Sequence, residues 1–127
     1  MIVTKATGFK RFYHATRYSL QGMRAAYKSE PAFRYECWGG IVLVPGALWL
    51  ANTGLQAALL IGCWLLILTM ELLNTAIEAV VDRAGTEFHA LAGLAKDLGS
   101  AAVLLSLLIT AMVWGGVAYD NFFAMVD

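Results

Sequence analysis

A long apolar run in this sequence continues, without a helix-breaking residue, into a segment that carries acidic and amide side chains. The run covers residues 55–70, and the segment that follows reads Glu71-Leu-Leu-Asn74-Thr-Ala-Ile-Glu78-Ala-Val-Val-Asp82-Arg83. This pattern predicts a single helix over residues 55–81. At about 100° per residue, its polar side chains fall within roughly 80° of arc on one face: Glu71, Asn74, Glu78 and Asp82. Polar groups at membrane depth are costly and are typical of functional sites.

The composition of the chain is that of an integral membrane protein. Of its 127 residues, 60% are hydrophobic and only 14% are charged, which is too apolar for a soluble domain of this size. No linker rich in proline, glycine or serine and no internal repeat divides the chain. Residues 1–127 are therefore predicted to form a single membrane domain of the all-α class.

Three segments are predicted to cross the membrane as helices. Residues 37–51 form a first span, which is short and interrupted by Pro45, and a polar turn follows it. Residues 55–81 form the second span, and residues 98–119 form a third span of adequate length. Residues 83–96 are predicted to be the polar connection between the second and third spans.

The N-terminal segment is predicted to form an amphipathic helix on the membrane surface, over residues 8–28. Its apolar stripe contains Phe9, Phe12, Tyr13, Leu20, Met23 and Tyr27, and its basic stripe contains Lys10, His14, Arg17, Gln21, Arg24 and Lys28. Such a helix can serve as an anchor alone, or as an anchor that also supplies cationic groups to a phosphorylated ligand. A helix break is predicted after it, at Ser29-Glu30-Pro31.

The distribution of lysine and arginine predicts the orientation in the membrane. All 9 of these residues precede the first span or lie in the connection 83–96, whereas the turn 52–54 and the C-terminal tail have none. By the positive-inside rule, the N-terminus and the connection are cytoplasmic. Three spans then place the C-terminus on the opposite side of the membrane.

This topology brings polar side chains from all three spans to the cytoplasmic boundary, with Glu71 roughly two to three turns deeper. The residues at the boundary are Glu30, Glu36, Glu78, Asp82, Lys96, Asp97 and Ser100. Ionised carboxylates in such a setting require cations nearby, either metal ions or basic side chains. Glu30 and Glu78 offer hard oxygen ligands of the kind that bind Mg²⁺ together with substrate phosphates.

Several strings of the chain form a specific pattern. They are Glu71-x-x-Asn74-x-Ala76-Ile77-Glu78-x-x-Val81-Asp82-Arg83, Ala95-Lys96-Asp97-x-Gly99-Ser100, Gly8-Phe9-x-Arg11, Tyr18-Ser19, Arg24-Ala25-Ala26 and Glu30-x-Ala32-Phe33-Arg34-x-Glu36. Together they resemble the signature of the prokaryotic diacylglycerol kinase family, Gram-negative type. The resemblance implies a small three-span homotrimer of the bacterial inner membrane, with its C-terminus periplasmic and its active sites shared between subunits. It also implies transfer of the γ-phosphoryl group of ATP to the hydroxyl of diacylglycerol, which gives phosphatidic acid.

The resemblance also implies a role for each matching residue. Glu71 would be the general base, Asn74 would orient it or the lipid hydroxyl, and Glu30 and Glu78 would hold Mg²⁺ on the ATP phosphates. The implied ATP-binding residues are Arg11, Tyr18, Glu30, Glu78, Glu87, His89, Lys96 and Asp97. The implied lipid-binding residues are Arg11, Arg24, Glu71, Ser100 and Trp114.

Other functions compete with this interpretation. A related branch of the family phosphorylates undecaprenol, and Glu36 favours diacylglycerol because that branch tends to have histidine at this position. A non-enzymatic oligomer that conducts ions would use a deep carboxylate such as Glu71, but would not need the polar residues at the boundary. A purely structural scaffold leaves that gathering of polar residues unexplained.

Some single residues also have simpler interpretations. Asp82 can form an exposed interfacial pair with Arg83, His89 can be a solvated loop residue, and Ser100 can bond to its own helix backbone. The chain has no Walker A loop, no Gly-rich kinase loop and no His-Arg-Asp string, which argues against the mechanism of soluble kinases.

Overall fold

The chain folds into helices alone over the residues that the structure describes. A computed structural model describes residues 8–84 and 89–124, and within these ranges it contains α-helices and no strand. The helices are α1 (Phe9–Ser29), α2 (Pro31–Leu50), α3 (Gly54–Arg83) and α4 (Ala90–Phe122). The predicted all-α fold class is confirmed.

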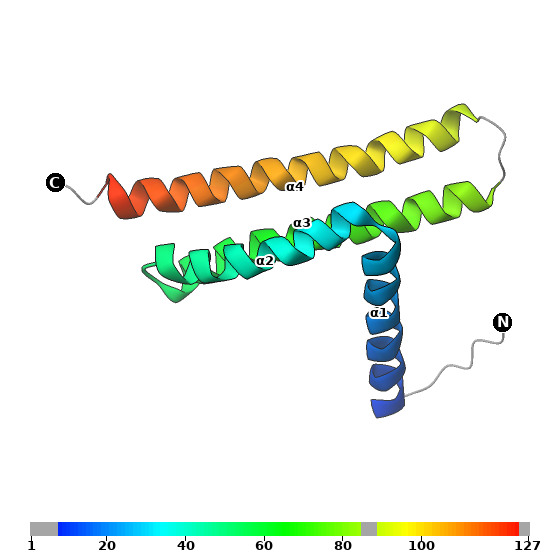
Figure 1. Cartoon of the computed structure of the whole chain (residues 1–127), viewed down its shortest axis with the longest axis horizontal. Helices are drawn as coiled ribbons and strands as arrows, with labels where there is room; N and C mark the ends of the chain where they lie inside the picture. Colours follow the sequence, from blue (N-terminus) through cyan, green and yellow to red (C-terminus); the bar gives the residue numbers. More distant parts are fainter. Residues whose placement is uncertain (1–7, 85–88, 125–127) are drawn as a thin grey trace.

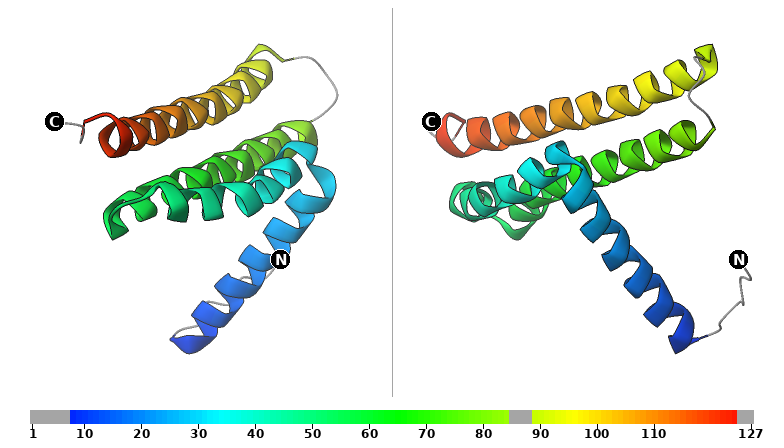
Figure 2. Two further views of the ribbon diagram at one scale, coloured as in Figure 1. Left: turned by 60° about the vertical axis from the view of Figure 1, so that its left-hand side comes forward. Right: turned by 45° about the vertical axis from the view of Figure 1, so that its right-hand side comes forward.

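Helix α3 is the centre of the bundle (Figure 1). It packs along α4 on one side and along α2 on another, whereas α2 and α4 have little contact with each other. Both neighbours run antiparallel to α3. Helix α1 leaves the bundle where α2 begins and points away from it in every view (Figures 1 and 2).

The junction between α1 and α2 is a sharp elbow, at the break that the sequence predicts. Glu30 has an extended backbone (φ −115°, ψ 105°), and Pro31 occupies the first turn of α2, where a missing N–H is tolerated. Arg34 donates through Nε to the carbonyl of Tyr27 and through a terminal nitrogen to that of Lys28, each at 3.0 Å. The guanidinium therefore satisfies carbonyls at the C-terminal end of α1, which fixes the direction of that helix.

Helix α2 begins at Pro31, at the predicted break, and continues into the predicted first span, so that its first turns carry the charged side chains of Arg34 and Glu36 ahead of that span. It also runs through Pro45 without a break, so the predicted interruption there is wrong. Proline in an apolar helix is tolerated where neighbouring helices and local adjustment compensate for the lost backbone hydrogen bond.

Helix α4 begins earlier than predicted, which shortens the connection from α3. The Nδ1 atom of His89 accepts a hydrogen bond from the N–H of Leu91 at 3.1 Å and so caps the helix just before Ala90. Gly93, which indicated a loop, lies inside the helix. Lys96 consequently lies on a helix, with a defined direction relative to α3.

A set of amide hydrogen bonds closes the end of the bundle where α2 turns into α3. The side chain of Asn121 on α4 donates to the carbonyl of Leu50 (2.6 Å) and to the side chain of Gln56 (3.0 Å). Gln56 in turn donates to Asn121 (3.1 Å) and accepts from the backbone of Asn52 (2.8 Å). We call this the amide end; beside it lies the buried cluster of Ala47, Leu50, Leu60 and Val117.

Two helices of the described ranges, α3 and α4, are long and apolar enough to cross a membrane. Much of the apolar surface faces outward: Val42, Val80 and Met112 are 74%, 72% and 76% exposed in the single chain. A surface of this kind is unfavourable in water, and it calls for lipid or further protein around the bundle.

Candidate active site

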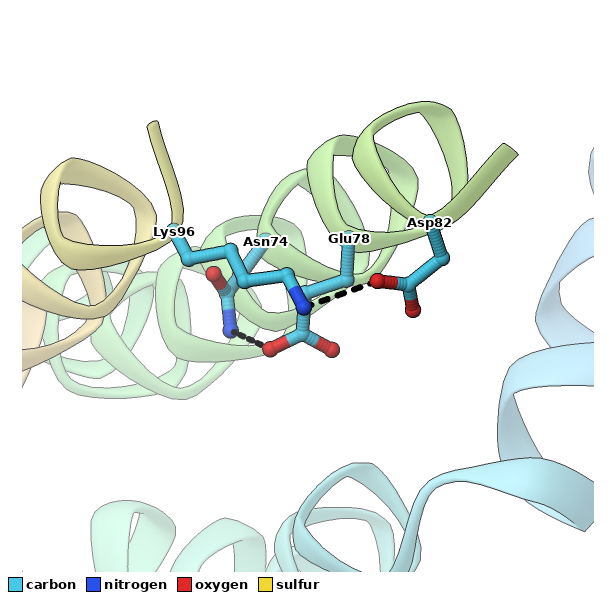
Figure 3. A network of polar contacts seen from close by, with 4 residues as sticks. All are labelled: Asn74, Glu78, Asp82 and Lys96. Atoms are coloured by element: carbon cyan, nitrogen blue, oxygen red, sulfur yellow. Dashed lines mark hydrogen bonds and ion pairs between the residues drawn. The ribbon is translucent and has the colours of Figure 1, made fainter. Parts of the chain in front are cut away.

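The acidic face of α3 meets α4 at the end of the bundle opposite the amide end, which we call the acidic end. Figure 3 shows its polar contacts. The Nδ2 atom of Asn74 donates a long hydrogen bond of 3.4 Å to Oε1 of Glu78, one turn further along α3. On the next turn, Oδ1 of Asp82 forms an ion pair with Nζ of Lys96 on α4, at a distance of 2.8 Å. Three residues of the face predicted from helical spacing, Asn74, Glu78 and Asp82, are therefore engaged in polar contacts.

Acidic side chains from α2 and from the elbow approach the same face. Glu30 lies at the elbow, Glu36 in the second turn of α2, and Glu78 two turns from Glu71 on α3. The fold therefore gathers carboxylates from three segments toward the end of the bundle where Glu71 lies. A concentration of like charges is stable only with protons or cations to offset it.

The position of Glu36 beside α3 is fixed by a tryptophan. The indole nitrogen of Trp64 on α3 donates to the backbone carbonyl of Glu36 at 2.7 Å. The indole ring lies where a β-carbon of Gly40 would be, since a side chain at that position would overlap the ring. This contact sets the register between α2 and α3, and with it the position of Glu36 relative to Glu71.

The carboxylate oxygens of the acidic end suit a hard divalent cation whose remaining ligands are water or phosphate oxygens. Among residues 8–84 and 89–124, no three side chains of the His, Cys, Asp and Glu types lie close enough together to hold a metal ion alone. Magnesium usually takes only one or two carboxylates from a protein and completes its octahedron with water and phosphate oxygens. Glu30 and Glu78, the predicted metal ligands, are compatible with that pattern.

The predicted ligand-binding residues Arg11, Tyr18 and Arg24 are exposed on α1, the helix that points away from the bundle (Figures 1 and 2). Arg24 lies on an exposed face of α1 with Tyr13, Thr16, Arg17, Leu20 and Gln21. Arg11 lies on the exposed surface near Gly8 and Phe12, at the start of the same helix. Tyr18 stacks on His14, with 6.3 Å between ring centroids. The single chain does not bring Arg11 and Tyr18 to Glu78.

The remaining predicted residues are spread along α4 and the connection. His89 caps α4, and Asp97 and Ser100 are exposed near its start. Glu87 lies outside the described residues. Trp114 is about 27 Å along the helix from Lys96, and it packs beside the buried cluster at the amide end. Its indole N–H is buried without an acceptor in the part of the chain that the structure describes.

Two features of the site were not predicted from the sequence. Gly99 lies directly against the Asn74 amide, and the sequence offered only its place in the string Lys96-Asp97-x-Gly99-Ser100 as a signal. The sequence gives no signal for the role of Trp64, because an indole in an apolar run normally indicates packing. Asn74, predicted to orient Glu71 or a lipid hydroxyl, has its hydrogen bond to Glu78.

The helices and the acidic end define a class: a small all-helical protein with membrane-length apolar helices and a polar site at one end. Comparison with known proteins gives the family. Residues 17–118 match the family described as prokaryotic diacylglycerol kinase, and the chain belongs to this family of ATP-dependent phosphotransferases of the membrane. The resemblance seen in the sequence is confirmed.

The similarity to curated members extends over nearly the whole chain. A diacylglycerol kinase of Haemophilus influenzae is 47% identical over 115 residues, which cover 91% of this chain and 98% of the relative. A diacylglycerol kinase of Escherichia coli is 42% identical over 121 residues, which cover 95% of this chain and 99% of the relative. One of Pseudomonas aeruginosa is 45% identical over 111 residues, which cover 87% of this chain and 90% of the relative.

Proposed function

We propose that this chain transfers the γ-phosphoryl group of ATP to the hydroxyl of diacylglycerol and so forms phosphatidic acid. Membership of the family supports the class of reaction. The observation that carries the assignment to this site is the polar face of α3, where Glu71 shares a helix face with the hydrogen-bonded pair Asn74–Glu78 and where Lys96 of the facing helix pairs with Asp82. Such a site combines a base, oxygen ligands and a cation, which are the groups that phosphoryl transfer requires.

In the proposed reaction, Glu71 is the general base. Its carboxylate takes the proton of the diacylglycerol hydroxyl while the hydroxyl oxygen bonds to the γ-phosphorus. The bond from that phosphorus to the β–γ bridging oxygen breaks, and ADP leaves with the electron pair. Along the axis of α3, Glu71 lies about 10 Å from Glu78, on the side away from the acidic end. This separation matches a lipid substrate on one side and a nucleotide at the membrane surface on the other.

Glu78 and Glu30 are proposed to hold the Mg²⁺ that accompanies ATP, and the metal would neutralise charge on the phosphates. Asn74 steadies the carboxylate of Glu78, to which it donates. Lys96 is proposed to contact the phosphates, with Asp82 as its partner when nucleotide is absent. Further nucleotide contacts are proposed for Arg11, Tyr18, Glu87, His89 and Asp97.

The active chain is proposed to be a homotrimer whose sites combine residues of neighbouring subunits. Helix α1 carries Arg11 and Tyr18 away from the acidic end of its own chain, which supports their contribution to another subunit's site. The outward apolar side chains of α2, α3 and α4 provide surface for lipid and for subunit contacts. Arg24, Ser100 and Trp114 are proposed to contact the lipid substrate, along with Arg11.

The proposed location is the bacterial inner membrane, with α2, α3 and α4 as three spans of a single domain over residues 1–127. Helix α1 lies on the cytoplasmic surface, and the C-terminus is periplasmic. The orientation rests on the positions of lysine and arginine, none of which lies in the turn at the amide end or in the C-terminal tail.

The proposed function is tested by supplying purified protein in lipid with radiolabelled ATP, Mg²⁺ and two competing acceptors, diacylglycerol and undecaprenol. We expect labelled phosphatidic acid to be the main product. Preference for the polyprenol would assign the sister activity to the same site. Label in neither lipid, together with proton or ion flux across sealed vesicles, would instead support an ion-conducting oligomer.

A further inference from the structure

The space beside Gly99 on α4 is occupied by the side chain of Asn74 on α3. Gly99 is buried where the two helices face each other. A β-carbon at residue 99 would overlap the Oδ1 atom of Asn74, come within 3.2 Å of its Cγ and lie 3.5 Å from Cδ1 of Ile77. Only glycine at this position leaves the Asn74 amide where the structure places it.

Both ends of the Asn74 amide have defined neighbours. Its Nδ2 donates to Glu78, and its Oδ1 is buried without an N–H or O–H donor among the described residues. On the side of α4, that oxygen is close to Gly99, whose lack of a side chain leaves the space for it. With the amide turned over, its oxygen would face the carboxylate of Glu78, and the two would repel each other.

We propose that Gly99 is a positioning residue of the phosphoryl-transfer site: it holds the Asn74 amide in the orientation that directs the carboxylate of Glu78. This inference rests on the proposed role of Glu78 toward Mg·ATP. A side chain at residue 99 displaces the amide, and Glu78 then loses its donor. The atom that must move is the end of a side chain and not the backbone of α3, so α3 and α4 keep their packing.

The chain offers a matched control on the same helix. A β-carbon at Gly93 would have no atom within 4 Å, whereas one at Gly99 would meet Asn74. Gly93→Ala and Gly99→Ala each exchange the same two residue types inside α4, and both raise helix propensity. They therefore differ in the displacement of the amide and not in their effect on the helix itself.

The orientation of the amide can be observed without any reaction. The chain has three asparagines, Asn52, Asn74 and Asn121, so isotope-labelled asparagine gives few side-chain amide signals in NMR spectra of the full chain. The signals of Asn74 are identified by their loss in Asn74→Ala. We expect Gly99→Ala to shift them and Gly93→Ala to leave them in place.

The functional test measures the turnover of diacylglycerol in a double-mutant cycle of Gly99→Ala and Asn74→Ala. We expect Gly99→Ala to lower the turnover of diacylglycerol by about tenfold to hundredfold, since small misplacements of site residues have effects of this size. In the Asn74→Ala background the same substitution should have no further effect, because the shortened side chain leaves room for the β-carbon. The concentration of Mg²⁺ that gives half-maximal rate should rise in Gly99→Ala and stay unchanged in Gly93→Ala.

Two results would overturn the positioning role. One is an Asn74 signal that does not move in Gly99→Ala. The other concerns the double-mutant cycle. If Gly99→Ala lowers turnover by the same factor in the Asn74→Ala background as in the unmodified chain, Gly99 acts through helix packing and not through Asn74. If Gly99→Ala alone does not fold, recovery of folding in the double variant supports the overlap with Asn74, and failure of both contradicts it. An Asn74 signal that moves in a protein without kinase activity would refute the proposed function, while the placement of the Asn74 amide by Gly99 would still hold.

Discussion

The side-chain nitrogen of Lys96 on α4 lies 2.8 Å from the carboxylate of Asp82 on α3, and this ion pair bridges the two helices at the acidic end. Both side chains are substantially exposed, at 43% and 66%. Exposed pairs of this kind contribute little to stability, because water already solvates both charges and the side chains lose freedom when they pair. The pair therefore has more significance for ligand binding than for folding.

Lys96→Gln is expected to weaken the binding of Mg·ATP while leaving the fold intact. Loss of a charged hydrogen bond to phosphate removes about 1.5–3 kcal/mol, which corresponds to an increase in KM for ATP of about tenfold to hundredfold. Thermal unfolding should be nearly unchanged, because both partners of the pair are exposed. Lys28→Gln, at the last turn of α1, is the matched control and should leave KM unchanged. An unaltered KM in Lys96→Gln would remove Lys96 from the proposed nucleotide site.

Glu71→Gln is expected to lower turnover by about 10²-fold to 10⁴-fold, the usual contribution of a general base. The amide has the same shape but cannot accept the proton of the lipid hydroxyl, so nucleotide binding should be nearly unchanged. Asp120→Asn makes the same chemical change toward the other end of α4 and should have no effect. The measurements are single-turnover rates of phosphatidic acid formation and nucleotide titrations. Turnover near that of the unmodified chain in Glu71→Gln would refute the base assignment.

Glu78→Gln is expected to act on the metal and not on proton transfer. An amide oxygen is a weaker ligand for Mg²⁺ than a carboxylate, so the Mg²⁺ concentration for half-maximal rate should rise by about tenfold, or about 1.4 kcal/mol. Glu36→Gln provides the comparison, because it makes the same chemical change at the start of α2 and Glu36 is not a proposed ligand. The same Mg²⁺ dependence in the Glu78 variant and in the unmodified chain would contradict the ligand role.

Gly40→Ala is expected to destabilise the packing of α2 on α3. The added methyl group would overlap the indole of Trp64, and overpacking of this kind typically costs about 1–3 kcal/mol. Gly39→Ala is the control on the neighbouring residue, where a β-carbon would have an ordinary contact of 4.0 Å with Leu43. Unfolding of both variants in lipid or detergent measures the difference. Equal stability of the two variants would show that the Trp64 contact is not what sets the register of α2.

The acidic face and the elbow could be predicted from the sequence because both are local. The spacing of Glu71, Asn74, Glu78 and Asp82 fixes their common face as soon as the segment is helical. Glu30 followed by Pro31 ends one helix and starts the next through backbone chemistry alone. These features need no knowledge of how the helices pack.

The rest of the site depends on contacts between helices, which spacing does not reveal. The position of Glu36 against α3 follows from the hydrogen bond of Trp64 across α2 and α3. The place of Asn74 follows from the absence of a side chain at Gly99. The start of α4 at Ala90 was not predicted, because Gly93 and the polar residues of the segment 83–96 are typical of a loop. In the structure, the cap by His89 allows the helix to begin before Gly93.

At the elbow, Arg34 of α2 binds the carbonyls of Tyr27 and Lys28 at the end of α1. These bonds couple the direction of α1 to that of α2, so that α1 acts as a lever. With 21 residues, the lever is about 30 Å long. A tilt of the bundle by about 10° would then displace the far end of α1, where Arg11 lies, by about 5 Å. The depth at which that arginine meets the membrane surface is thus tied to the inclination of helices that it does not touch.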